Sequence, residues 1–323
     1  MRFAAYVHQD RHRLGVVAAD GTLFPLPDTT SLTALITEAD GLPGLLAVGQ
    51  EALEGPRGPH VSDVRLLPPL QPTSVRDFVT FEEHVEGVRR SVDGVAGVPE
   101  QWYAAPTFYF TNPHAIYAHQ DDIPMPPGST VLDYELEVGA VIGREGRDLT
   151  PEQAREHIIG YTVFNDWSAR DLQSAEMKVG LGPCKGKDTA TTLGPYLVTA
   201  DELEPHRGAD GFLRLALTAD INGETIGKDL LSNMSWTFEE MVAYASRGTR
   251  VVPGDVLGSG TCGNGGCLGE LWGLRGEQTP PPLKPGDTVT LTVEGVGTLT
   301  NTVVPGAAPI PLPAGRRRGR ERP

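Results

Sequence analysis

The chain has 323 residues, of which 39% are hydrophobic, and it carries a formal net charge of −15. This length suffices for a large core and predicts one sizeable domain with a smaller one, while the acidic balance argues against a nucleic acid or an anionic membrane as partner. No run approaches the roughly 20 apolar residues of a membrane span, and the first residues form no apolar signal core. The three cysteines lack a Cys-x-x-Cys motif and are expected to be reduced, so we expect a cytoplasmic protein.

The first part of the chain predicts a small α+β unit. Short strands are expected over residues 3–26, around a turn signal at Asp20-Gly21, and a short helix is expected over 31–39. The proline-rich segment 66–72 breaks regular structure and marks a boundary. We therefore expect a small N-terminal domain over residues 1–70 and a larger domain over 71–305.

Further elements follow in chain order. Residues 75–90 suit a helical lid, and a helix opens at Thr150-Pro151, with threonine as cap and proline in the first position, and runs to about residue 159. Apolar residues recur with helical period over 235–246. Strands are expected at 132–142, 160–166, 193–199, 212–221, 288–293 and 296–303. The proline- and arginine-rich end, 306–323, is predicted to be a disordered tail, with a functional basic patch as the lesser alternative.

Two glutamates, Glu135 and Glu137, stand one residue apart in the strand-like run Leu132-Asp-Tyr-Glu-Leu-Glu-Val138. Side chains at i and i+2 of a strand point to the same face. Two carboxylates among buried neighbours favour a hard divalent cation between them: Mg²⁺, Mn²⁺ or Ca²⁺. The pair taken alone is equally compatible with a solvent-facing stripe.

The strand over 160–166 ends in Asn165-Asp166, and a helix is expected to begin at Trp167. Asp166 therefore lies where site residues often lie, although a plain helix cap is the alternative. A glycine-rich loop follows, with Lys187 as a candidate partner for a substrate oxyanion. The loop is not a P-loop, because Lys187 is followed by aspartate.

Together these segments resemble the fumarylacetoacetate hydrolase family over roughly residues 72–305. The matching motifs are Glu-x-Glu at 135/137, Asn-Asp-Trp-Ser-Ala-Arg-Asp-x-Gln at 165–173, Leu-Gly-Pro and Gly-Lys within 181–187, and Gly-Ser-Gly-Thr at 258–261. The resemblance implies a mostly β fold with some α (α+β), in which residues 71–305 form a catalytic β-roll or barrel domain. It also implies a divalent metal, Mg²⁺ or Mn²⁺ with Ca²⁺ as a further option, held by Glu135, Glu137, Asp166 and Asp77.

The same resemblance implies a general base. Asp77 and His84 have the family's seven-residue spacing, and a histidine titrates near neutral pH. Without the resemblance, His84 would read as an ordinary surface histidine of a helix. Glu270 resembles the partner carboxylate that orients the base, with Glu86 as a weaker candidate.

Substrate contacts are implied as well. Arg89 or Arg90 stands near the family's carboxylate-reading arginine, although both also suit a solvated helix end. The other implied contacts are Gln173, Thr261 and Tyr109. The chain departs from the family at Met177, at Asn112 and in one extra residue of the lysine loop, which bears on the substrate more than on the chemistry.

We therefore expect a metal-dependent hydrolase that cleaves a C–C bond in a 1,3-diketo acid of the fumarylacetoacetate, fumarylpyruvate or acylpyruvate type. His84 and Glu270 would activate water, and Lys187 would hold the oxyanion. The alternatives are decarboxylation of a β-keto acid such as oxaloacetate, isomerisation of a 2-hydroxyhepta-2,4-diene-1,7-dioate, or a non-catalytic scaffold. The expected partners are a small anionic diketo or keto acid and, from the resemblance, a second copy of the chain in a homodimer.

Overall fold

The computed structural model describes residues 1–27, 31–92 and 94–319. Their strands form an eleven-stranded, a five-stranded and a two-stranded sheet. The expected α+β fold, mostly β, is confirmed, and the large sheet runs in an open order from β3 to β6. Among the described residues no single helix is long and apolar enough to cross a membrane. Helices α1 (Leu32–Ala39) and α2 (Leu42–Leu53) reach that length only when they are counted together, and a bend of 119° separates them.

The large sheet has the order β3-β2-β1-β13-β11-β10-β16-β5-β6, with β4 paired to β1 and β7 to β13. The bounds are β1 (Arg2–His8), β2 (Arg11–Val17), β3 (Leu23–Pro25), β4 (Arg65–Leu66), β5 (Val75–Phe78), β6 (Phe108–Thr111), β7 (Ile116–Tyr117), β10 (Leu136–Ile142), β11 (Ile158–Asp166), β13 (Thr191–Thr199) and β16 (Val256–Gly258). Every residue of β10 and β11 is buried. These central strands are therefore covered on both faces, which explains their near-continuous apolar sequence.

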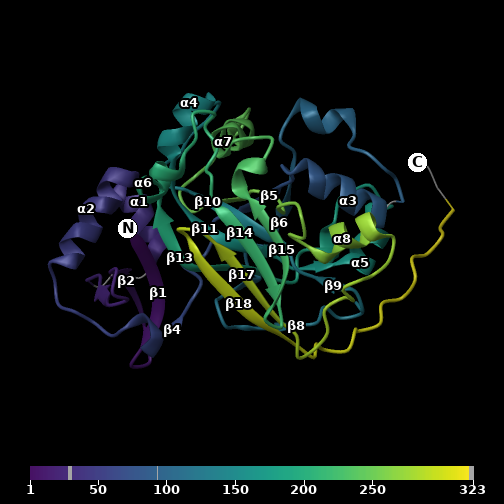
Figure 1. Cartoon of the computed structure of the whole chain (residues 1–323), viewed down its shortest axis with the longest axis horizontal. Helices are drawn as coiled ribbons and strands as arrows, with labels where there is room; N and C mark the ends of the chain where they lie inside the picture. Colours follow the sequence, from purple (N-terminus) through teal and green to yellow (C-terminus); the bar gives the residue numbers. More distant parts are fainter. Residues whose placement is uncertain (28–30, 93, 320–323) are drawn as a thin grey trace.

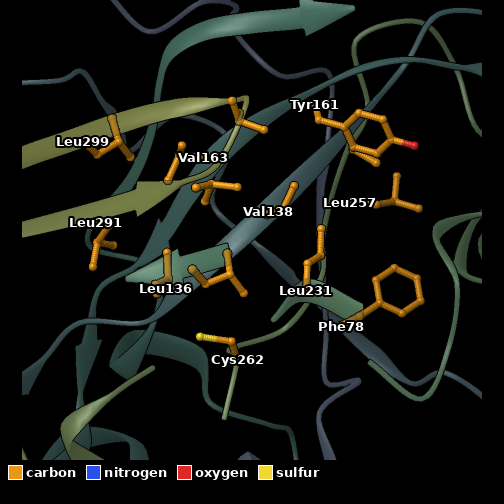
Figure 2. Packing of buried hydrophobic residues seen from close by; sticks show 14 of the residues in the cluster. Phe78, Leu136, Val138, Tyr161, Val163, Leu231, Leu257, Cys262, Leu291 and Leu299 are labelled. Carbon is orange, nitrogen blue, oxygen red and sulfur yellow. The ribbon is translucent and has the colours of Figure 1, made fainter. Parts of the chain in front are cut away.

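The five-stranded sheet covers one face of the large sheet (Figure 1). Its order is β15 (Glu224–Leu230), β14 (Ala216–Ile221), β17 (Thr288–Val293), β18 (Gly297–Val304) and β8 (Asp122–Pro124). Burial alternates along β17 and β18, as expected for one packed and one outward face. Figure 2 shows Leu291 and Leu299 of these strands facing Leu136, Val138 and Val163 of the large sheet. This apolar layer is the main core.

The remaining elements are short. The two-stranded sheet pairs β9 (Leu132–Asp133) with β12 (Ser168–Ala169). The helices are α1 (Leu32–Ala39), α2 (Leu42–Leu53), α3 (Glu82–Val92), α4 (Pro151–Ala154), α5 (Arg170–Met177), α6 (Ala200–Leu203), α7 (Phe238–Ser246) and α8 (Leu268–Arg275). The 3-10 turns are η1 (Val61–Asp63), η2 (Glu100–Ala104), η3 (Arg155–His157), η4 (Cys184–Gly186), η5 (Glu204–His206) and η6 (Leu231–Asn233).

The N-terminal strands continue the large sheet. β1 pairs with β13, where Phe3 lies opposite Leu197. A second core cluster joins Phe3 and Ile36 to Val141 and Leu197. The division at residue 70 stays a prediction, which limited proteolysis would test.

Several predicted boundaries were wrong. Residues 75–78 form strand β5, and the helix of the predicted lid begins only at Glu82. The helix at Thr150 has the predicted cap, but α4 ends at Ala154 and β11 begins at Ile158. The helix expected at Trp167 begins at Arg170.

The strand expected over 212–221 begins at Ala216, and helices α2 and α8 were not predicted. Residues 306–319 of the predicted tail are exposed and contain no helix or strand, and residues 320–323 lie outside the described part of the chain.

Candidate active site

Four carboxylates come together where strands of the large sheet end. Asp77 lies in β5, Glu135 between β9 and β10, Glu137 in β10, and Asp166 at the end of β11. Each of the four is at most 3% exposed. One oxygen each from Asp77, Glu135 and Glu137 lies within 4.8 Å of the others.

A glycine makes room for two of these groups. A Cβ on Gly258, in the neighbouring strand β16, would lie 2.6 Å from an oxygen of Asp77 and 2.8 Å from an oxygen of Glu137. Any side chain at this position would therefore occupy the space of the two carboxylates. The Gly258-Ser-Gly-Thr261 motif thus contributes space as well as backbone donors, since Gly260 N donates to Glu137 Oε2 at 3.0 Å.

Asp166 is joined to the group through Lys187 and Tyr109. Lys187 Nζ donates to Asp166 at 2.8 Å and also to Glu135. The hydroxyl of Tyr109 lies 2.7 Å from Asp77 Oδ2 and also contacts Asp166. One oxygen each of Asp77 and Asp166 is buried without a hydrogen-bond partner among the described residues.

The carboxylates outnumber the cations beside them. Burial, followed by the neighbouring negative charges, raises the pKa of Glu137 and Asp166 well above the usual range and also raises that of Asp77. Burial alone would raise the pKa of Glu135 too, but Lys187 and Arg170 outweigh it and hold that pKa well below its usual value. A hard divalent cation would neutralise the excess charge and take up the unpartnered oxygens. The donor set therefore fits such a metal.

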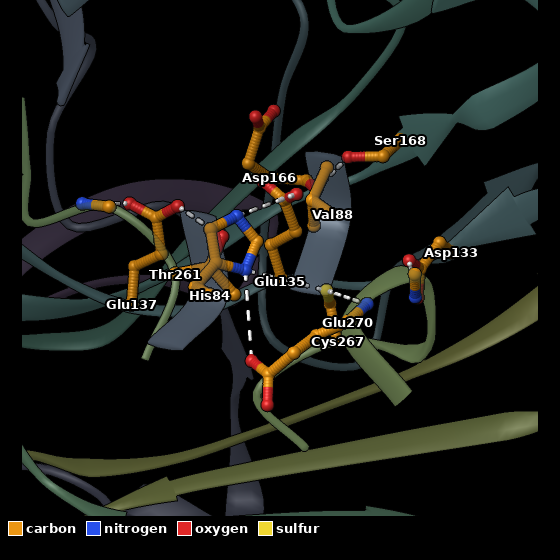
Figure 3. Close-up of polar contacts among 12 residues, drawn as sticks. His84, Val88, Asp133, Glu135, Glu137, Asp166, Ser168, Thr261, Cys267 and Glu270 are labelled. Atoms are coloured by element: carbon orange, nitrogen blue, oxygen red, sulfur yellow. Dashed lines mark hydrogen bonds and ion pairs between the residues drawn. The ribbon is translucent and has the colours of Figure 1, made fainter. Parts of the chain in front are cut away.

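The imidazole of His84, on α3, lies beside this acidic cluster (Figure 3). Its Nε2 is 4.0 Å from Glu135 Oε1, and its Nδ1 is 3.9 Å from Glu270 Oε2. Burial lowers the pKa of His84 to about 3, and burial raises the pKa of Glu270 to about 8. Burial thus favours the neutral form of the ring. Cys267 Sγ also lies 3.6 Å from Nδ1, a neighbour that sequence reasoning missed.

Close packing of α3 on α8 brings Glu270 to this position. A Cβ on Gly87 would lie 2.5 Å from Glu270 Cγ and 3.0 Å from its Cα. In turn, a Cβ on Gly273 would collide with the carbonyl oxygen of Gly87. The absence of a side chain at Gly87 therefore leaves the space in which Glu270 of α8 approaches His84.

A cavity of about 400 Å³ opens beside these groups. Its lining includes most of the predicted site residues: Asp77, His84, Arg89, Tyr109, Glu135, Glu137, Gln173, Lys187 and Thr261. Asp166 and Glu270 lie behind this lining and reach it through Lys187 and His84. Arg90 does not line the cavity; it pairs with Glu86 at 2.6 Å on the outer side of α3. This leaves Arg89 as the arginine candidate for a substrate contact and removes Glu86 as a partner of His84.

Residues 73–304 match the model of a protein family described as fumarylacetoacetate (FAA) hydrolase, C-terminal. The chain belongs to the fumarylacetoacetate hydrolase family. Oxaloacetate tautomerase YisK of Bacillus subtilis is 27% identical over 313 residues, which span 93% of this chain and 96% of the relative.

Two solved structures of the family resemble this one along nearly the whole chain. Fumarylacetoacetate hydrolase from Exiguobacterium antarcticum has 28% identity and a TM-score of 0.71, over 94% of this chain and 99% of that one. A 5-carboxymethyl-2-hydroxymuconate delta-isomerase from Mycobacterium smegmatis has 26% identity and a TM-score of 0.66, over 94% of this chain and 100% of that one. The names of these relatives give different activities, so the choice among these activities depends on the residues around the acidic cluster.

Sequence reasoning missed two buried residues of this family site. Arg170 donates to Glu135 at 2.7 Å and to Gln173 at 3.0 Å. Asp133 accepts from Arg170 at 2.9 Å. Arg170 lies inside the matched motif at 165–173, and Asp133 lies two residues before the Glu-x-Glu motif at 135/137. A charged residue in an otherwise buried strand was the signal that could have identified Asp133.

Proposed function

We propose that the protein is a divalent-metal-dependent hydrolase that cleaves a C–C bond in a 1,3-diketo acid of the acylpyruvate, fumarylpyruvate or fumarylacetoacetate type. The observation that carries this proposal is the position of the buried imidazole of His84, which lies between Glu135 and Glu270 at the edge of the acidic cluster. An imidazole at that place can take a proton from water. This favours a reaction in which water is the nucleophile.

Glu135, Glu137, Asp166 and Asp77 would hold the metal, with Mg²⁺ or Mn²⁺ suited to an all-carboxylate set. When bound, the cation would supply Lewis-acid polarisation of the keto acid's oxygens. Arg170 and Lys187 hold the carboxylate of Glu135 ionised and in place.

His84 accepts the proton of the attacking water at one ring nitrogen while Glu270 faces the other. When ionised, the carboxyl group of Glu270 would fix the ring's orientation and stabilise the imidazolium that forms. Because burial raises the pKa of Glu270 to about 8, this contribution grows as the pH rises toward that value. Hydroxide adds to the acyl carbonyl, the C–C bond breaks, and the departing carbon takes up a proton. The products are one carboxylic acid and one keto acid, a 2-keto acid from an acylpyruvate, which together account for the diketo acid and one water.

Four further residues would bind the substrate. Lys187 is a buried cation whose pKa is raised by Asp166 and Glu135 despite its burial, so it stays charged beside a developing oxyanion. Gln173 and Thr261 line the cavity with polar groups. Arg89 also lines the cavity and is the candidate for a contact with the keto acid's carboxylate.

A second candidate is proton transfer on a keto acid, as in an oxaloacetate tautomerase. The Bacillus subtilis relative of that name matches nearly the whole chain. The imidazole of His84 could instead transfer a proton between a carbon and an oxygen of the keto acid, without hydrolysis. Decarboxylation and isomerisation on the same metal site need no activated water either.

A substrate panel separates these reactions. Acetylpyruvate, fumarylpyruvate, fumarylacetoacetate and oxaloacetate would be incubated with the protein, with and without Mg²⁺ or Mn²⁺. Products would be resolved by mass, and the enol of oxaloacetate followed by ultraviolet absorbance. Metal-dependent formation of two acids from a diketo acid supports the hydrolase. If the oxaloacetate enol signal is lost and no diketo acid is cleaved, the protein is a tautomerase and not a hydrolase. Release of carbon dioxide from oxaloacetate would instead identify a decarboxylase.

We further propose, from the family resemblance, that the protein is a cytoplasmic homodimer. Light scattering coupled to size-exclusion chromatography would measure the mass against the 34.6 kDa of one chain. A monomer over the concentration range of the assays would overturn that part.

A further inference from the structure

The lining of the substrate cavity contains two chemically different sets of side chains. One set is the acidic cluster with Lys187 and Arg170. The other set is apolar and comes from α3, from η2 with the proline before it, and from the end of α5; we call it the apolar wall: Val85, Val88, Val92, Pro99, Trp102 and Met177. This division carries information about the substrate, since each part of a bound molecule meets a different environment.

The apolar wall starts one helical turn from His84. Val88 and Val92 follow His84 at i+4 and i+8 on α3, so they lie on nearly the same side of that helix. A carbonyl attacked by water from His84 would therefore carry its substituent along α3, over Val88 and then Val92. Each turn adds about 5.4 Å, which is the length of several methylene groups.

Trp102 gives the wall a fixed apolar surface. Its indole Nε1 donates to the carbonyl of Val79 at 2.7 Å, and the residue is only 5% exposed. Because the one polar atom of this side chain is already bonded, the ring offers only apolar surface to the cavity. Met177, which is 42% exposed, also lines the cavity and can adapt to ligands of different shape.

Charges are scarce along the wall. Apart from the acidic cluster, His84, Lys187 and Arg170, Arg89 is the one charged side chain among the described lining residues. Arg89 donates to the carbonyl of Gly97 and is the candidate partner of the keto acid's own carboxylate. A second carboxylate on the acyl group would therefore lose its water for a wall of valines and tryptophan, and no other cation outside the acidic cluster would pair with it.

We propose that the acyl substituent of the substrate is apolar, a straight alkyl chain of four or more carbons or an aryl ring, rather than a second carboxylate arm. This inference rests on the proposed hydrolase function, whose site it extends to a substrate class. The substrate is thus a 2,4-diketo acid with an apolar tail, and the products are pyruvate and an alkanoic or aromatic acid.

The test compares kcat/KM along a series of acylpyruvates with the Mn²⁺-loaded protein: acetyl, butanoyl, hexanoyl and benzoyl, with fumarylpyruvate as the charged member. We expect kcat/KM to rise about fourfold per added methylene up to hexanoyl, and benzoylpyruvate to exceed fumarylpyruvate. A flat series, or a preference for fumarylpyruvate, would overturn the proposal.

Variants locate the effect on the wall. Val88→Thr and Val92→Thr keep side-chain shape but add a hydroxyl, and each should lower the hexanoyl-to-acetyl ratio of kcat/KM by about fivefold or more. Val179→Thr is the matched control, because Val179 is 72% exposed and is not among the lining residues; its ratio should equal that of the wild type. An unchanged ratio in both wall variants would remove α3 from substrate selection.

Calorimetric binding of 2-oxobutanoate and 2-oxooctanoate to the Mn²⁺-loaded protein separates this inference from the hydrolase itself. Tighter binding of the longer acid with no cleavage of any diketo acid would overturn the hydrolase and leave the apolar wall standing. If diketo acids are cleaved but a longer tail raises neither kcat/KM nor binding affinity, the hydrolase function stands and the proposal of an apolar substrate tail is overturned.

Discussion

Asp133 accepts a hydrogen bond from Arg170 Nε at 2.9 Å, and this pair joins a carboxylate of the acidic cluster to helix α8. The same guanidinium donates to Glu135 at 2.7 Å. Asp133 also accepts from the backbone N–H groups of Leu268 and Gly269 at 2.8 Å each, at the start of the helix that carries Glu270. One buried aspartate thus orients both the candidate metal ligand and the candidate partner of His84.

We therefore predict that Asp133→Asn weakens metal binding and the fold together. The variant leaves the buried Arg170 without a charged partner on that side, and breaking a buried ion pair costs about 3–5 kcal/mol. Urea denaturation and Mn²⁺ titration would measure the two effects. Asp122→Asn, at an exposed position of β8, is the control and should change neither. Wild-type stability in Asp133→Asn would show that the pair does not hold α8.

Metal binding should be visible in stability as well as in turnover. A ligand that binds only the native state stabilises it by about 2.7 kcal/mol at 100 times its Kd, so Mn²⁺ should raise the melting temperature and a chelator should reverse the rise. Glu137→Gln removes one ligand and one crowded negative charge. We expect this variant to lose the Mn²⁺ shift while its metal-free form is at least as stable as wild type, because burial and neighbouring carboxylates oppose ionisation of Glu137.

The control for this experiment is Glu224→Gln, on the exposed side of β15, which should retain the full shift. If Glu137→Gln kept the shift, the cation would have to bind elsewhere.

His84→Ala should keep the metal and lose the reaction. The imidazole lies 4.0 Å from Glu135 and is not needed to complete the carboxylate set. Removal of a general base typically lowers turnover by about 10²–10⁴-fold. Initial rates on the best diketo acid of the panel, together with the Mn²⁺ melting shift, would measure both properties. His12→Ala, exposed on β2, is the control. Full turnover in His84→Ala would exclude His84 as the base.

The acidic cluster was predictable because its signals are local. The pair Glu135 and Glu137 and the strand ending in Asp166 stand out in a single window of sequence. The geometry that joins them was not predictable in detail, because Glu135 lies in a break between two strands. Its backbone N–H donates to the side chain of Asn165 at 2.9 Å instead of to a ladder carbonyl. The side-chain amide of Asn165 thus positions Glu135 in the site. The sequence had predicted that the regular alternation of one continuous strand would do so.

Helix α8 was not predicted, because its sequence lacks the local signal of an amphipathic helix. Its residues Leu268 through Trp272 are all buried, so the segment has no polar face and no apolar period. Helix α2 contains Pro43 and two glycines, of which Gly49 is the point where Met1 and Phe3 approach the helix. In both helices the packing partners, which are distant in sequence, override weak local signals.

The pH dependence of stability gives a test of Glu270 that does not depend on turnover. Burial raises its pKa to about 8 in the native state from an ordinary value of 4.5. Between these values the native protein binds the proton that the unfolded chain has lost, so stability falls as the pH rises through this range. The contribution is fully present below about pH 4.5 and is lost above about pH 8; it is on the order of 5 kcal/mol.

Glu270→Gln resembles the protonated side chain at every pH and lacks this dependence. Its free energy of unfolding, measured in urea with the metal removed, should therefore decline less between pH 5 and pH 8 than that of wild type. The other buried acids lower stability over this range in both proteins, so the difference between the two slopes isolates Glu270. Glu86→Gln, on the outer side of α3 in a pair with Arg90, should keep the wild-type slope. Equal slopes for Glu270→Gln and wild type would mean that Glu270 is ionised in the native state and faces His84 as a carboxylate already at pH 5.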